Sequence, residues 1–121
     1  MSENNIVDIM TEVNEKLIND FSEMEKLARD LDANGYTFEI IHETTPVYHL
    51  HRNQIWVWTD KTKTDTLFDA ICHIGSYGYE QGLIEIMGDR LMTEQDGGGS
   101  VAGWLTADQV IERLKRWEER R

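Results

Sequence analysis

The stretch LFDAICHIGSYGYEQGLIEIMG, Leu67–Gly88, places two short apolar runs on either side of the glycine-rich segment 75–82. Apolar residues alternate with others in both runs, which is the period of a β-strand. One face of the first strand would carry Phe68, Ala70, Cys72 and Ile74, and the return strand would add Ile84 and Ile86. The stretch therefore predicts a β-hairpin with a long loop.

A helix is the competing interpretation of residues 67–74, because Leu67, Ile71 and Ile74 also follow helical spacing. The glycines at positions 75, 78 and 82 disfavour a helix that continues through the segment, since each costs about 1 kcal/mol relative to alanine. A wide loop uses the same glycines without penalty, because they reach positive φ freely. We therefore favour the strand.

Length and composition predict one domain over residues 1–121. Cys72 is the single cysteine, which excludes an internal disulfide framework. We find no basic-then-apolar opening segment and no run near the roughly 18 apolar residues of a membrane span. We therefore expect a cytoplasmic protein without a membrane partner.

The formal net charge of −11 has the wrong sign for direct nucleic-acid binding, which needs Lys and Arg to replace phosphate counterions. The acidity is spread over the body of the chain, whereas residues 106–121 carry five basic and four acidic side chains. A well-solvated surface is the simpler explanation of such acidity, and a surface complementary to a basic partner is the alternative.

Apolar residues at alternating four- and three-residue spacing predict a long amphipathic helix in residues 1–34. They are Ile6, Met10, Val13, Leu17, Met24, Leu27 and Leu31. Asn34-Gly35 would end this helix. Because a helix over residues 6–31 is longer than a small sheet is wide, we predict a homodimer with Met10, Leu17 and Met24 near the contact; packing only on its own sheet is the alternative.

Three extended runs follow, at 36–42, 47–51 and 55–60. Arg52-Asn53-Gln54 have the composition of a turn and predict one before the third run. Alternation assigns Tyr36, Phe38, Ile40, Tyr48, Leu50, Ile55 and Val57 to a core face. With the hairpin, these runs predict an α+β fold: an antiparallel meander of about five strands over residues 35–92. Two helices would pack on one of its faces.

The opposite face collects aromatic, imidazole and acidic side chains, a mixture typical of a binding surface. We expect partner or ligand contacts from Trp56, Trp58, His49, His51, His73 and Glu85, with Tyr77 and Tyr79 on the long loop. A helix or subunit that covers this face as ordinary structure is the alternative. Tyr77 and Tyr79 could equally fold back onto the sheet edge.

His49 and His51 share a strand face, so a zinc site is geometrically conceivable. The chain has no H-E-x-x-H, C-x-x-C or calcium-loop pattern, and we predict no metal and no cofactor. His73 across from Glu85 would form an acid–base pair or an ordinary cross-strand contact. The alternative function is accordingly a small-ligand binder or a hydrolase that uses these four residues.

The C-terminal part has two predicted sections. Residues 93–103 contain Gly97-Gly98-Gly99, and we expect a flexible loop. In residues 104–121, the capping box from Thr106 to Gln109 starts a helix with apolar residues Val110, Ile111, Leu114 and Trp117.

Residues 76–85, SYGYEQGLIE, followed by Gly103-Trp104-Leu105-Thr106, resemble a pattern in small proteins encoded by phages and prophages of Gram-positive bacteria. The resemblance covers about the last half of the chain and implies no catalytic residue. It implies a context in which small acidic proteins bind and block a host protein, such as a defence nuclease. The leading hypothesis is therefore a non-enzymatic interaction protein.

Overall fold

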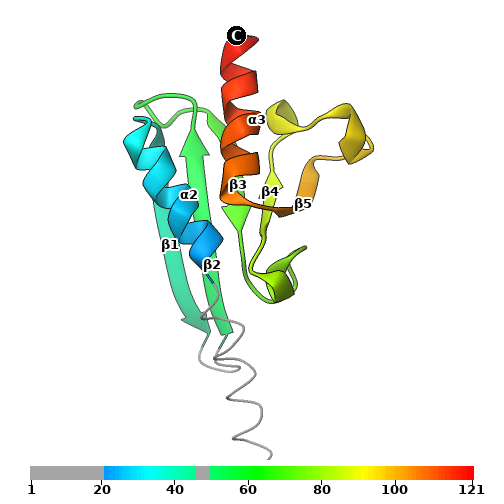
Figure 1. The fold of residues 1–121 in the computed structure, drawn as a ribbon. Helices are drawn as coiled ribbons and strands as arrows, with labels where there is room; N and C mark the ends of the chain where they lie inside the picture. The colour runs from blue at the N-terminus through cyan, green and yellow to red at the C-terminus, as the bar shows by residue number, and fades with distance from the viewer. Residues whose placement is uncertain (1–20, 46–49) are drawn as a thin grey trace, which may run out of the picture.

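The computed structural model describes residues 21–45 and 50–121, which form a five-stranded antiparallel sheet and two α-helices. The strands are β1 (Thr37–Thr45), β2 (Leu50–Trp58), β3 (Thr66–Ile71), β4 (Ile84–Met87) and β5 (Val101–Leu105). They lie in the sheet in chain order. The helices α2 (Ser22–Ala33) and α3 (Ala107–Glu119) cover the same face of the sheet (Figure 1). The predicted α+β class and meander are confirmed.

The hairpin that we predicted from Leu67–Gly88 is β3 and β4, paired antiparallel with Ala70 opposite Ile86. Residues 66–71 are a strand, so the helical interpretation of this run is wrong. The 3₁₀ helix η1 (Tyr79–Gln81) lies in the loop between them. A strand forms here, although the local spacing would also suit a helix, because β3 completes hydrogen-bonded ladders with β2 and with β4.

The core lies between the sheet and the two helices. Alternate strand positions supply Ile55, Val57, Phe68, Ala70, Ile84 and Ile86, and the helices add Met24, Leu27, Leu31, Val110 and Leu114. All of these side chains are buried. Burial of each large apolar side chain contributes about 1.5–3 kcal/mol. The predicted core positions are therefore confirmed at Ile55 and Val57 of β2 and in the β3–β4 hairpin at Phe68, Ala70, Ile84 and Ile86. Two expected core residues are wrong: Ile40 of β1 is 55% exposed, and Ile74, which lies beyond the end of β3, is 40% exposed.

Residues 50–51 of the second predicted run and residues 55–58 of the third belong to one strand. β2 continues from Leu50 to Trp58 and pairs with β1 throughout, with Asn53 opposite His42. The predicted turn at Arg52-Asn53-Gln54 is wrong, because ladder pairing with a neighbouring strand outweighs the local turn preference of these residues. Residues 47–49 lie outside the described part of the chain.

A continuous β2 also changes the assignment of faces. Leu50 has the parity of Trp56, whereas His51 pairs with Thr44 and has the parity of Ile55. The prediction that His51 shares a face with Trp56 concerns a side chain that lies outside the description. It depended on a turn that would have reset the alternation between the two positions.

The fifth strand lies where we expected a flexible loop. β5 begins at Val101, and residues 94–96 form a 3₁₀ helix, η3 (Glu94–Asp96), which opens with a capping box between Thr93 and Asp96. Arg113 of α3 holds Asp96 through two hydrogen bonds of 2.7 and 3.0 Å and also donates to the Leu91 carbonyl over 3.0 Å. Contacts with distant residues therefore order a segment whose local composition predicts flexibility.

The long N-terminal helix is not confirmed. Within the described residues α2 begins at Ser22, and the earlier part of the predicted helix, with the dimer contact that it would make, lies outside them. Met24 packs in the core of its own chain and is 2% exposed, so its expected place at a contact between copies is wrong. The predicted end is confirmed, because Gly35 has φ 76° and Tyr36 N–H donates to the Leu31 carbonyl over 3.0 Å.

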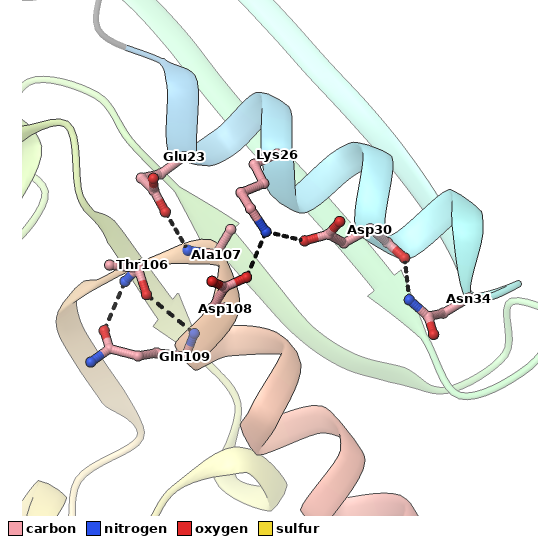
Figure 2. Close-up of polar contacts among 8 residues, drawn as sticks. All are labelled: Glu23, Lys26, Asp30, Asn34, Thr106, Ala107, Asp108 and Gln109. Carbon is pink, nitrogen blue, oxygen red and sulfur yellow. Dashed lines mark hydrogen bonds and ion pairs between the residues drawn. The ribbon is translucent and has the colours of Figure 1, made fainter.

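The two helices contact each other through the first turn of α3 (Figure 2). Thr106 and Gln109 form the predicted capping box. Glu23 of α2 accepts the Ala107 N–H over 2.7 Å, and Lys26 pairs with Asp108 at 2.5 Å and with Asp30 at 2.9 Å. Carboxylates at a helix N-terminus are favourable because unpaired N–H groups and the helix dipole are positive there.

Candidate protein-binding face

The loop after β3 is folded back onto β4 and β5. Trp104 N–H donates to the Tyr77 carbonyl over 3.2 Å, and Tyr77 N–H donates to Glu85 Oε1 over 3.0 Å. At the start of the loop, the Ser76 hydroxyl donates to the His73 carbonyl over 2.8 Å. Tyr77 is therefore held in a defined position beside the two strands.

Two glycines allow this close approach. A Cβ atom at Gly103 would lie 2.3 Å from the Cβ of Tyr77, and one at Gly78 would lie 3.0 Å from the Cα of Trp104. Gly78 also has φ 100°, in the left-handed region that side chains rarely adopt. Larger residues at these positions would separate the loop from β5.

Tyr77 and Trp104 form an exposed aromatic stack. Their ring centroids are 5.2 Å apart with an angle of 19° between the planes, and the residues are 55% and 56% exposed. Trp104 adopts φ 54°, which is uncommon for a residue other than glycine. Backbone strain of this kind is concentrated at functional sites, and here it presents a large ring to solvent.

We call the sheet face opposite α2 and α3 the open face. Trp56 is paired with Glu39 of β1 and with Asp69 of β3, and Asp69 is paired with Met87 of β4. Directly opposite residues share a face, so this row crosses four strands of the open face. Met87 is 50% exposed, and Trp56 is partly exposed.

A groove of about 420 Å³ lies along this row. Its lining includes Trp56, Asp69, Met87, Asp89, Arg90 and Ser100. Asp69 Oδ2 accepts the Gln54 side-chain amide over 2.9 Å. Arg90 forms two bonds of 2.8 Å to Asp65, and this pairing lowers the pKa of the Asp65 carboxyl group. The cation in the groove is therefore already paired.

Trp58, two residues along β2, has a cation of its own chain above it. Lys63 Nζ lies 5.1 Å from the centroid of the Trp58 ring and 2.6 Å from Glu39 Oε1. The ammonium group thus lies between an indole and a carboxylate, an arrangement that stabilises a cation by about 0.5–1 kcal/mol at exposed sites.

The predicted site residues do not all lie on one exposed surface. Trp56 and Trp58 have the parity of the open face, and Tyr77 is exposed beside it. Glu85 also has open-face parity but is 9% exposed, and its cross-strand partner is Ile71. The expected pairing of His73 with Glu85 is therefore wrong, because β3 ends at Ile71, before His73.

Tyr79 is buried and 4% exposed, so its expected presentation on the loop is wrong. Burial raises the pKa of its hydroxyl group to about 12, and Cys72 contributes to the shift. Tyr77 and Tyr79 are two residues apart, but the turn at Gly78 sends one ring outward and the other into the core. The sequence left an exposed and a folded-back position equally open for both tyrosines, and the structure exposes Tyr77 and buries Tyr79.

His49 lies outside the described residues, and nothing is described of the His51 side chain. Within the described part of the chain no group of three His, Cys, Asp or Glu residues could hold a metal ion. No helix described here is long and apolar enough to cross a membrane.

Trp104 is the exposed residue that sequence reasoning missed. The available signal was the Gly103-Trp104 pair at the end of a polar, glycine-rich segment, where an aromatic residue has no local reason to be buried. Its place beside Tyr77 depends on β5, which was not predicted. Comparison of the chain with protein-family models, curated protein sequences and solved structures found no match.

Proposed function

We propose that this protein is a non-enzymatic interaction protein that binds a host protein through its open face and the Tyr77–Trp104 stack. The observation that carries the proposal is the exposure of Met87, Tyr77 and Trp104, each at least 50%, on or beside a sheet face that neither α2 nor α3 covers. Exposed apolar and aromatic groups that adjoin one another mark interaction sites more often than solvated surface.

The residue types agree with this proposal. Binding energy at protein interfaces is concentrated in a few aromatic and Arg side chains, where truncation often costs 2 kcal/mol or more. Tyr77 and Trp104 are rigid, because hydrogen bonds and close glycine packing hold their backbone. A rigid contact residue loses little side-chain freedom on binding, which favours affinity.

The charge of −11 and the carboxylates of the open face, Glu39 and Asp69, favour a partner with a basic surface. The resemblance of residues 76–106 to phage proteins supports an inhibitor or modulator of a bacterial host protein, such as a defence nuclease. In this proposal the protein binds and blocks a basic surface on that host protein.

The alternative of a ligand-binding protein or hydrolase requires His49, His51, His73 and Glu85 to converge. Glu85 holds the Tyr77 backbone, and it faces Ile71 across the sheet. No observation on the described residues favours this second function, and we do not propose it.

The test starts from the partner captured from host lysate with this protein as bait, followed by affinity measurements with the purified pair. Trp56→Ala, Tyr77→Ala and Trp104→Ala should each weaken binding at least about tenfold, roughly 1.4 kcal/mol. Each variant should retain cooperative unfolding.

Ile40→Ala is the matched control, because Ile40 is 55% exposed on the helix side of the sheet. Its affinity should equal that of the wild type. The proposed binding face would be contradicted if all three aromatic variants bound the partner as tightly as the wild type does. A comparable loss of affinity in Ile40→Ala would also contradict it.

A further inference from the structure

The arrangement around Trp58 provides an internal example of how this sheet face binds a cation. Lys63 lies over the indole of Trp58 and bonds to Glu39, a residue of the neighbouring strand β1. The same combination recurs at Trp56, whose cross-strand neighbours are Glu39 on one side and Asp69 on the other. An aromatic ring and an adjacent carboxylate are thus placed together twice.

The second arrangement differs from the first in its cation. Among the described residues no Lys or Arg lies over the Trp56 ring. Arg90, which lines the same groove, is fixed by Asp65 and by the Thr66 carbonyl at 2.8 Å. Gln54 donates to one oxygen of Asp69, and the described residues supply no donor to the other.

The groove also has room for a side chain. Its volume of about 420 Å³ is bounded by the Trp56 ring, by Met87, and by the acids Asp69 and Asp89. Asp89 accepts the Ser100 hydroxyl, which holds its carboxylate at the rim. The lining therefore combines an aromatic ring, an apolar thioether and two carboxylates.

We propose that this groove receives an arginine side chain from the basic surface of the partner protein. A guanidinium group is planar, so it can stack on the indole of Trp56 while its N–H groups reach a carboxylate in the same plane. Lysine offers a more strongly hydrated point charge and no fork geometry, so it fits less well. The charge of −11 favours the approach of such a cation.

This inference rests on the proposed function, since it names the partner chemistry of the same face. It differs in the residues that decide it. Tyr77 and Trp104 belong to the binding face outside the groove, Asp69 belongs to the arginine groove, and Trp56 belongs to both. Variants of Trp104 and of Asp69 therefore separate the two proposals.

The test uses the full-length protein and acetyl-arginine amide as the probe, with the indole N–H signals of the four tryptophans followed by NMR. The Trp56 signal should shift in a saturable way, and the Trp104 signal should not. Acetyl-citrulline amide, which has nearly the same shape without the charge, should cause no shift. Acetyl-lysine amide should bind more weakly than the arginine probe.

Asp69→Asn removes the charge and keeps the shape of the side chain, so it should weaken the arginine probe about tenfold. Asp32→Asn is the matched control, because it changes net charge equally at an exposed position on α2. Its affinity should be unchanged.

The proposal is overturned if the arginine probe does not shift the Trp56 signal, or if the citrulline probe shifts it as the arginine probe does. It is also overturned if Asp69→Asn and Asp32→Asn bind the arginine probe with the same affinity. A Trp56 shift on concentrating the protein alone would assign the groove to a second copy and would also overturn it. Loss of partner binding in Trp104→Ala but not in Asp69→Asn would reject the groove and keep the proposed function.

Discussion

Gly103→Ala is expected to destabilise the protein by about 2 kcal/mol, because it places a methyl group where Tyr77 lies. The new Cβ would be 2.3 Å from the Cβ of Tyr77 and 3.1 Å from its carbonyl oxygen. Inserting a methyl group into a packed site costs about 1–3 kcal/mol. The substitution also lowers the entropy of the unfolded chain, which offsets about 0.4–1 kcal/mol.

Displacement of the loop is the other way to relieve this contact, and it has a similar cost. It would break the hydrogen bond from Trp104 N–H to the Tyr77 carbonyl, worth about 0.5–1.5 kcal/mol. It would also separate the Tyr77–Trp104 stack, worth another 0.5–1.5 kcal/mol or so. Because a contact of 2.3 Å is far shorter than ordinary Cβ contacts, the upper part of each range applies, and after the entropy offset both routes lead to a net loss near 2 kcal/mol.

Urea unfolding followed by far-UV circular dichroism measures this loss, and the melting temperature should fall by roughly 6–10 °C. Gly99→Ala is the control: the nearest atom to its added Cβ is 4.0 Å away, and Gly99 does not have positive φ. This variant should be as stable as the wild type or slightly more stable. Equal stability of Gly103→Ala and Gly99→Ala would refute the reasoning.

Three further predictions concern stability. The paired Arg113 guanidinium lowers the pKa of Asp96 to about 2, so its contribution is present above pH 4 and is lost as the pH falls toward 2. With solvent screening included, Asp96→Asn should cost about 1–2 kcal/mol in urea unfolding at pH 7 and almost nothing at pH 2; a constant difference would contradict the ion pair. The Tyr79 hydroxyl is buried without a hydrogen-bond partner among the described residues, so Tyr79→Phe should leave stability unchanged or raise it by about 1 kcal/mol. Because the pKa of Tyr79 is raised to about 12, the wild type should lose stability as the pH rises above 10, and Tyr79→Phe should lose less. Glu23→Ala should lower thermal stability by about 1 kcal/mol, because the Ala107 N–H loses its acceptor, whereas Glu25→Ala in the same first turn of α2 should not; the opposite order would argue against this capping contact.

Prediction of the fold succeeded where local pattern and tertiary contact agree. The alternation around Phe68 and Ile86 survives in β3 and β4, since the hydrophobic period decides which strand face is buried. The capping box at Thr106 is a short-range device whose partners are three residues apart. Such features depend on few distant residues.

Prediction failed where a distant partner decided the outcome. Residues 52–54 have the composition of a turn, but β1 supplies a complete ladder opposite them and makes them strand. Residues 101–103 of β5 were assigned to a loop because Gly97, Gly98 and Gly99 just before them predict flexibility, yet β4 pairs with β5. In both cases the missing information was the neighbour across the sheet.

The candidate site was predicted only in part for the same reason. The sequence by itself determined the alternation that separates Trp56 from Ile55 and the acidity of the chain, because both follow from residue order and type. Only the tertiary structure decided that Tyr77 faces solvent while Tyr79 is buried, and that Trp104 stacks on Tyr77. These positions depend on the contact of the loop with β5, which joins residues that are far apart in the chain and leaves no local pattern.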